Sequence, residues 1–382
     1  MHCALQAHDE GFLMRTRSTV VLLTLFLLLS CSSTPRTTMV TPAARVYHGT
    51  ASVGDFMTIT VNSTAQTIAY TDVSNGSTGI VPYTVNSDGT YTLNDPTGNL
   101  VGAYEVPNYA MIIQAAKTGP NSNTPALITA VESGPITLAT FEGQSYNYMQ
   151  FRTAAGGIEV GSLSVSTQGL GSVSSYWPYG SLNQSGSPFN VGTVDIMQAQ
   201  LDPTGTFLEV PDPGSSTVFD YVFGTANGIF AVDTPNGAIL GLKKAASKDF
   251  DPSVAGTYRA IYYQKTGAST GAGNIETGNA SLANATLVVT SGGQVTVTDA
   301  QGNRLTQATL TPVADVSYLY GSSGELTDPC YGVFTFRVTT ASSQQDFFVT
   351  FMGQAMLFSS FSANLPWTSG GTYNYFYGVG LQ

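Results

Sequence analysis

Short stretches of alternating apolar and polar residues, separated by turn sequences, follow one another along most of this chain. Met57, Ile59 and Val61, for example, alternate with polar residues. A period of two places successive side chains on opposite faces of a β-strand. Between Val85 and Leu93, an Asp-Gly pair separates two such stretches, which is typical of a hairpin because Gly adopts the positive φ that the turn needs. The pattern predicts an all-β fold of two or more antiparallel β-barrel or β-sandwich domains joined by short hairpin turns.

The composition agrees with this interpretation. Only 10% of the residues are charged, against about 25% in an ordinary soluble domain. Long amphipathic helices and coiled coils need many charged residues on their wet faces, so this composition argues against them. A disordered chain is also disfavoured, because 42% of the residues are hydrophobic and the chain has 20 Tyr and 19 Phe.

The N-terminal region has the features of a secretory signal. Arg15 and Arg17 precede the apolar run Val20–Leu29, and a charged segment before a short apolar one is typical of an exported protein. The run is shorter than the roughly 20 residues of a transmembrane helix. Residues 1–13 lack signal character, which makes Met14 an alternative start.

The signal ends in Leu28-Leu29-Ser30-Cys31, which resembles the lipobox of bacterial lipoproteins. The resemblance implies cleavage before Cys31 and attachment of lipid, palmitate included, to that cysteine. It also implies a location in the cell envelope, with the membrane reached through the anchor. Ser32 after the cysteine resembles lipoproteins of the outer membrane, if the host is Gram-negative. The alternative is an ordinary signal in which the cysteine occurs by chance.

Changes in composition divide the rest of the chain. After the signal peptide (1–30), residues 31–45 are rich in Ser, Thr and Pro and are expected to form a flexible tether. A β-rich domain, of one or two units, is predicted for 46–242. A lysine-containing linker is predicted for 243–253, and a second β-barrel or sandwich for 254–382.

The last predicted strand has one apolar face. Tyr373, Tyr375 and Tyr377 share this face with Val379 and Leu381, so we expect it to lie on a core, with a wetter face opposite. The opposite face carries two glycines, at 378 and 380, which indicate a bend or a close approach of another segment.

Removal of the signal leaves few residues for cofactor chemistry. His48 is then the only histidine, and Cys330 is the only cysteine besides the acylated Cys31. Zinc and iron sites built on several His or Cys residues are therefore excluded within one chain, and no cofactor is predicted. The net charge of −11 argues against nucleic acid as a partner.

The sequence identifies no catalytic residue. A Ser-His-Asp triad would have to use His48, and the Gly-x-Ser-x-Gly match at 267–271 has no helical pattern after it. We interpret that match as a hairpin loop, and His48 as a structural or surface residue.

A pair of carboxylates could still hydrolyse a glycosidic bond, because such a reaction needs only two suitably spaced acids. Glu105, Glu132, Glu142 and Glu159 fall in one predicted unit. A carboxylate-dependent envelope hydrolase is therefore one alternative function, and whether any pair is catalytic stays open at this point.

Aromatic residues next to Pro, Gly and amides mark the predicted ligand-binding segment. It contains Tyr176, Trp177 and Tyr179, and it is expected to be a loop because the residues from Ser174 onward show no strand alternation. Trp367 lies in a second segment of this kind. Aromatic rings stack on sugar rings while neighbouring amides bond hydroxyl groups. The alternative is that both tryptophans plug the ends of barrels.

These observations favour a lipid-anchored binding or adhesion module over an enzyme. Its predicted ligand is a carbohydrate or an envelope protein. The remaining alternative is a structural envelope lipoprotein without a small ligand.

Overall fold

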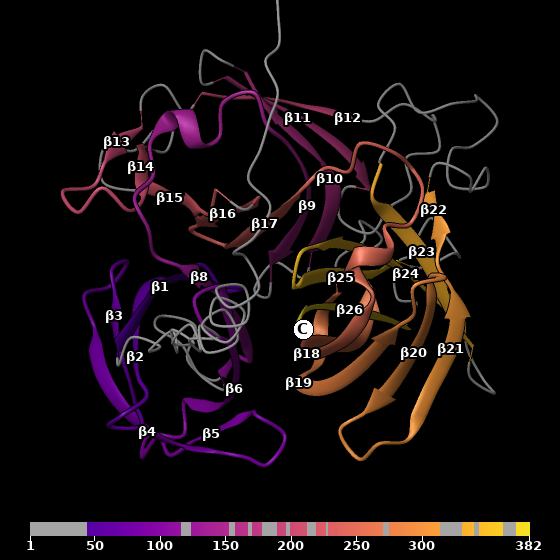
Figure 1. Ribbon diagram of the computed structural model, residues 1–382, viewed down its shortest axis with the longest axis horizontal. Helices are drawn as coiled ribbons and strands as arrows, with labels where there is room; N and C mark the ends of the chain where they lie inside the picture. Colours follow the sequence, from indigo (N-terminus) through magenta and orange to yellow (C-terminus); the bar gives the residue numbers. More distant parts are fainter. Residues whose placement is uncertain are drawn as a thin grey trace, which may run out of the picture. The chain divides into compact units, whose positions relative to one another are not determined.

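The structure of the protein is a computed structural model. It describes residues 44–115, 124–152, 157–166, 170–177, 189–195, 199–211, 219–226, 228–269, 275–313, 331–339, 344–361 and 372–382. Residues 43–382 form one compact unit that contains all the strands (Figure 1). No α-helix occurs in the described ranges, and η2 (Leu138–Thr140) and η4 (Pro252–Val254) are short 3-10 turns. Nothing helical in these ranges is long and apolar enough to pass through a membrane. The predicted all-β class with antiparallel barrels is confirmed.

The first sheet is a closed barrel of eight antiparallel strands (Figure 1). Its first and last strands pair directly, from Tyr47 opposite Glu132 to Ala51 opposite Ile128. The strands, in barrel order, are β1 (Ala44–Ala51), β2 (Phe56–Asn62), β3 (Thr67–Asp72), β4 (Thr78–Val85), β5 (Tyr91–Leu93), β6 (Leu100–Val106), β7 (Ala110–Ala115) and β8 (Ala126–Glu132).

The alternation in the sequence builds the core of this barrel. Met57, Ile59 and Val61 all belong to one buried cluster inside it, as the period of two predicts. Full burial of such an aliphatic side chain stabilises the fold by about 1.5–3 kcal/mol. The predicted hairpin between β4 and β5 is confirmed, and Gly89 supplies the positive φ of its turn, +84°.

The second sheet has nine antiparallel strands and is built from the middle of the chain. The strand β9 joins the two halves of this sheet. It pairs on one side with β10, from the N-terminal half, and on the other side with β17, the last strand of the C-terminal half. In spatial order the strands are β12 (Phe189–Asp195), β11 (Leu170–Trp177), β10 (Gly157–Val165), β9 (Ser145–Arg152), β17 (Gly237–Lys243), β16 (Ile229–Thr234), β15 (Phe219–Gly224), β14 (Leu208–Pro211) and β13 (Gln200–Leu201).

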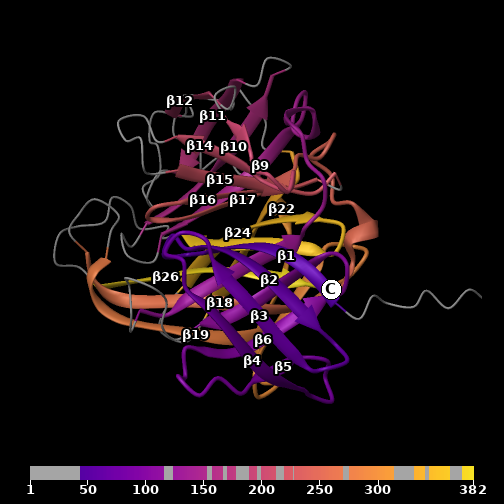
Figure 2. The ribbon, with the colours of Figure 1, turned by 90° about the vertical axis from the view of Figure 1, so that its left-hand side faces the viewer.

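The third sheet also has nine antiparallel strands, and it nearly closes. Thr306 Oγ1 of one edge strand donates a hydrogen bond to the Arg337 carbonyl, in the strand next to the opposite edge. The long hairpin of β18 and β19 curves along one side (Figure 2). In spatial order the strands are β21 (Arg304–Thr309), β20 (Gln294–Asp299), β19 (Ile275–Val289), β18 (Gly256–Ser269), β26 (Thr372–Leu381), β25 (Ala355–Phe361), β24 (Gln344–Met352), β23 (Val333–Thr339) and β22 (Thr311–Pro312).

Outer faces of the three sheets share one hydrophobic core. Phe151 of the second sheet stacks on Tyr377 of the third, with ring centroids 4.4 Å apart and an angle of 10° between the planes. Phe56 from the first barrel belongs to the same core and stacks on Tyr221 of the second sheet. The aromatic face predicted for the last strand is therefore buried, and Tyr375 and Tyr377 lie in this shared core.

Three local expectations differ from the structure. Ala44 and Arg45 belong to β1 rather than to the tether, because Arg45 is buried in the barrel by an ion pair. Gly267–Ser269 continue β18, where pairing with β19 extends the strand beyond the expected loop. Ser174–Trp177 also lie in a strand, β11, and not in a loop, since they pair with β10 and β12.

Candidate functional site

The inside of the third sheet contains a cavity of about 290 Å³. Every strand from β18 to β26 except the two-residue β22 contributes to its wall. Most of the lining is apolar or aromatic, and it consists of Tyr262, Ala285, Leu287, Val297, Leu305, Phe336, Val338, Phe347, Phe358 and Phe376. A volume near 300 Å³ is at the lower end of the range for small-molecule sites.

Aromatic rings in contact with one another form much of this wall. Phe336 and Phe347 stack across β23 and β24 with centroids 5.1 Å apart and planes 9° apart. Phe376 of β26 packs 5.8 Å from Phe347 and 6.2 Å from Tyr262. Because each ring is held by neighbouring rings and by paired strands, the cavity is preformed in this structure.

Two glycines of β26 explain why only part of the interior is hollow. Gly378 and Gly380 lie on the same face of β26 as Phe376, toward the inside of the sheet. A Cβ at position 378 would overlap the Phe358 ring, and one at position 380 would lie 2.6 Å from Met356 Cε. Other side chains therefore fill the space beside the glycines, and the cavity lies beside Asn374 and Phe376.

Besides Tyr262, which carries a hydroxyl group, the polar residues of the lining are three amides: Gln264, Gln345 and Asn374. Asn374 is exposed, Gln264 and Gln345 are half-buried, and Leu305, also in the wall, is 44% exposed. Asn374 Oδ1 accepts a hydrogen bond from Thr266 Oγ1 at 2.5 Å. All three amides are thus at least partly exposed, whereas Phe336, Phe347 and Phe358 are buried.

This lining favours one class of ligand. None of the thirteen described lining residues is charged, and burial of an unpaired charge among apolar side chains is costly. Amide groups donate and accept hydrogen bonds without a net charge. The cavity therefore suits an uncharged molecule with an apolar body and a hydrogen-bonding group at one end.

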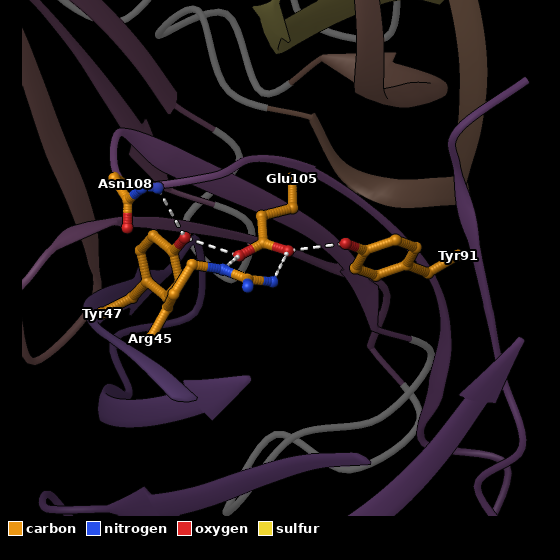
Figure 3. Close-up of polar contacts among 5 residues, drawn as sticks. All are labelled: Arg45, Tyr47, Tyr91, Glu105 and Asn108. Atoms are coloured by element: carbon orange, nitrogen blue, oxygen red, sulfur yellow. Dashed lines mark hydrogen bonds and ion pairs between the residues drawn. The ribbon is translucent and has the colours of Figure 1, made fainter. Parts of the chain in front are cut away.

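A cluster of buried polar side chains lies in the first barrel (Figure 3). The Glu105 carboxylate accepts hydrogen bonds from Arg45 Nε and Nη2 at 2.6 and 2.7 Å. It also accepts hydrogen bonds from the hydroxyl groups of Tyr47 and Tyr91, at 2.5 and 2.6 Å. The hydrogen bonds to Glu105 raise the pKa of Arg45. The pKa of Tyr47 is raised mainly by burial and also by its hydrogen bond to Glu105.

This arrangement indicates that Glu105 has a structural role. Its side chain has no exposed surface, and four donors occupy its carboxylate oxygens. A general acid or base must reach a substrate proton, and Glu105 is enclosed. Of the other candidate acids, Glu132 ends β8 and Glu142 follows η2, both half-buried, while the Glu159 side chain lies outside the described residues.

His48 is buried where β1 of the first barrel meets the second sheet. Its Nε2 lies 2.9 Å from Ser133 Oγ and 2.8 Å from Thr206 Oγ1. Burial lowers the pKa of His48 to about 4, although the nearby Asp202 opposes this effect. A Ser-His contact can activate a nucleophile, but a ring that is 4% exposed and hard to protonate is a structural link between the sheets.

The structure places the predicted ligand residues only in part. Tyr176 and Trp177 are the last two residues of β11, and their side chains lie outside the described parts of the structure. Tyr179, Trp367 and Cys31 are also outside the described residues. Among the described residues, no group of three or more His, Cys, Asp or Glu side chains is placed to hold a metal ion.

Sequence reasoning did not identify the cavity. Its residues come from eight strands between 256 and 381, and each strand supplies one or two of them. The available signal was the alternation of phenylalanines at 334 and 336, and at 347 and 351. That pattern predicts an aromatic interior and does not show whether the interior is filled.

Neither the protein-family models nor the curated proteins give a match to this sequence. Two crystal structures of transferrin binding protein B align with the chain at low scores. For a double mutant from Haemophilus parasuis Hp5, the identity is 9% over 89% of this chain and 76% of that chain, with a TM-score of 0.30. For the isotype 1 protein from serogroup B Neisseria meningitidis, the identity is 11% over 86% and 66%, with a TM-score of 0.27.

Proposed function

We propose that this protein is a lipid-anchored binding module of the cell envelope that holds an uncharged, mainly apolar ligand inside its third sheet. The observation that carries the proposal is the cavity of about 290 Å³, with aromatic walls and three amides that are at least partly exposed. Two residues considered for enzyme chemistry are enclosed: Glu105 is surrounded by its donors, and His48 is buried with a low pKa.

An uncharged fluorescent probe tests this function in the compact unit of residues 43–382, without detergent. N-phenyl-1-naphthylamine should bind saturably, with one site per chain. The anionic probe 1-anilinonaphthalene-8-sulfonate has a similar aromatic body and serves as the matched control. It should bind at least about tenfold more weakly, because its sulfonate cannot be solvated by apolar walls and neutral amides. Equal affinities, or a signal that does not saturate, would count against the proposal.

The anchor is supported by the sequence from Arg15 to Cys31. If Cys31 is acylated, a Cys31→Ala variant of the full chain should accumulate as an unprocessed precursor and incorporate no labelled palmitate. Equal incorporation by variant and wild type would contradict the anchor. In a Gram-negative host, the wild type should fractionate with the outer membrane, because Ser32 follows the cysteine.

A carbohydrate or protein ligand at the segment of Tyr176, Trp177 and Tyr179 remains a prediction from the sequence. If Trp177 belongs to an exposed platform, Trp177→Ala should change the free energy of unfolding by no more than about 0.5 kcal/mol. A buried Trp177 would instead cost about 3–5 kcal/mol. Acrylamide quenching in a Trp367→Phe background reports the exposure of Trp177 directly.

A further inference from the structure

A second hollow lies between the first barrel and the third sheet, within the same compact unit. This groove has a volume of about 510 Å³. One wall comes from the β4–β5 hairpin and from β6 and β7, and the other comes from β18, β19 and β20. It is separate from the cavity inside the third sheet: of all the residues lining either hollow, only Ala285 lines both.

The groove differs from the cavity in its side chains. Hydroxyl and amide groups line both walls: Asn86, Thr90 and Thr92 on the barrel, and Asn284, Thr286 and Thr298 on the sheet. Val101, which is 44% exposed, adds apolar surface. A mixture of neutral hydrogen-bonding groups and small apolar patches matches a sugar ring, which has hydroxyl groups at its rim and C–H groups on its faces.

One ion pair joins the two walls. Arg259 Nη1 of β18 lies 3.2 Å from Asp88 Oδ2 in the β4–β5 turn, and both side chains are partly exposed, by 32% and 45%. The Arg259 guanidinium also lies over the Tyr104 ring, 5.8 Å from its centroid. An arginine side chain donates hydrogen bonds, and a carboxylate accepts them. Arg259 can therefore donate to one hydroxyl group of a sugar while Asp88 accepts a hydrogen bond from the neighbouring hydroxyl group.

The charges in the groove favour a neutral ligand. Asp88 balances Arg259, and Asp299 accepts hydrogen bonds from its own turn, at Gln301 N and Asn303 N. Hydrogen bonds from Thr90, and then the charge of Arg259, lower the pKa of Asp88, so the carboxylate stays ionised at neutral pH. The chain as a whole carries a net charge of −11, which disfavours an acidic ligand.

The strand pairing argues against an extended peptide. A peptide commonly binds to a sheet by adding a strand at a free edge. On the barrel side, β5 and β7 lie in a closed barrel, and on the other side β18, β19 and β20 each pair with two neighbours. The groove therefore offers side chains and no free strand edge, which suits hydroxyl groups better than peptide backbone.

From these observations we propose that the groove between the first barrel and the third sheet binds a neutral oligosaccharide. Arg259 and Asp88 hold one sugar by its hydroxyl groups, and the Thr and Asn side chains of the two walls bond further hydroxyls. This site is independent of the ligand cavity, so either proposal can fail without the other.

The test uses the compact unit of residues 43–382 on an array of neutral oligosaccharides, acidic oligosaccharides and peptides. The wild type should bind neutral oligosaccharides. Thr286→Trp places a large side chain in the groove and should abolish this binding, whereas Asp88→Ala should weaken it about tenfold or more. Val288→Trp is the matched control, because Val288 lies on the same strand and face and does not line the groove.

The control should bind as the wild type does, and so should the cavity variant Val297→Trp. Melting temperatures close to that of the wild type show that each variant is folded. Binding of only peptides or only acidic glycans, or no binding by the folded wild type, would overturn the proposal. Undiminished binding by a folded Thr286→Trp variant would overturn it as well.

Discussion

Arg45 and Glu105 form a buried bidentate ion pair that joins β1 to β6 in the first barrel. Their side chains are 5% and 0% exposed, and two tyrosine hydroxyl groups complete the shell around the carboxylate. The two charges can be buried because each carboxylate oxygen of Glu105 accepts hydrogen bonds.

Removal of one partner should therefore be costly. Arg45→Ala leaves the Glu105 carboxylate buried without its counter-charge, and we expect a loss of about 3–5 kcal/mol in the free energy of unfolding. Asp88→Ala breaks the partly exposed pair with Arg259 and serves as the control, with an expected loss of about 0–1 kcal/mol. Urea denaturation at neutral pH measures both values, and equal losses would contradict the structural role of Glu105.

His48 should make stability depend on pH. Its pKa is about 4 in the folded protein because of burial, against about 6.5 in an unfolded chain. The unfolded state therefore takes up a proton first as the pH falls. This contribution is fully present above pH 6.5 and is lost progressively toward pH 4, by about 3 kcal/mol in total.

The variant His48→Gln isolates this effect from the titration of the carboxylates. The stability of the wild type relative to the variant should fall when the pH is lowered from 7.5 to 4.5 in denaturation experiments. A difference that stays constant over this range would show that His48 titrates normally in the folded protein.

Asp233 should have the opposite pH dependence. It is 2% exposed and accepts a hydrogen bond from Thr50 Oγ1 at 2.5 Å. Burial raises its pKa well above the ordinary value, and the nearby Asp55 raises it further. The folded state therefore holds the proton more tightly than the unfolded state, and stability from this group is lost as the pH rises.

Asp233→Asn keeps the acceptor oxygen and removes the titration. The melting temperature of this variant relative to the wild type should increase between pH 5 and pH 8. A variant that becomes less stable than the wild type over this interval would contradict the protonated state of Asp233.

Gly378 should tolerate no side chain. A Cβ there would overlap the Phe358 ring and lie 2.8 Å from the Ile261 carbonyl oxygen. Gly378→Ala should destabilise the protein by about 1–3 kcal/mol. Gly134 has no heavy atom within 4 Å of an added Cβ, so Gly134→Ala is the control and should be nearly neutral in a thermal melt. Equal melting temperatures for the two variants would contradict the close packing at β26.

Local patterns predicted the strands and many of the turns. The period of two placed Met57, Ile59 and Val61 inside the first barrel, and the Asp-Gly pair located the turn at Gly89. These features depend on backbone preferences and side-chain faces within a few residues. They could be predicted because no distant contact alters them.

The two faces of β26 show where such reasoning stops. The pattern predicted that Tyr375 and Tyr377 are buried, which is confirmed. It did not show that Tyr377 stacks on Phe151 of another sheet. Nor did it show that Asn374 and Phe376, on the face expected to be wetter, line a cavity. Which sheet covers which face depends on the arrangement of whole sheets, and no single strand encodes it.

The buried polar sites required contacts between distant residues. His48 meets Thr206, 158 positions away, and Arg45 meets Glu105, 60 positions away. Arg45 was assigned to the tether because Ser, Thr and Pro dominate the residues before it. The ion pair that orders this end of β1 could not be inferred from local composition.

The most direct test of a ligand site inside the third sheet compares two Val→Trp variants of neighbouring strands. Val297 lines the cavity, whereas Val288 is 41% exposed and lies on the outer face of the same sheet. The measurement is the affinity of each folded variant for N-phenyl-1-naphthylamine, by fluorescence titration. The account predicts that Val297→Trp weakens binding by about tenfold or more, while Val288→Trp binds as the wild type does. Unchanged binding by Val297→Trp, or equal losses in both variants, would contradict it.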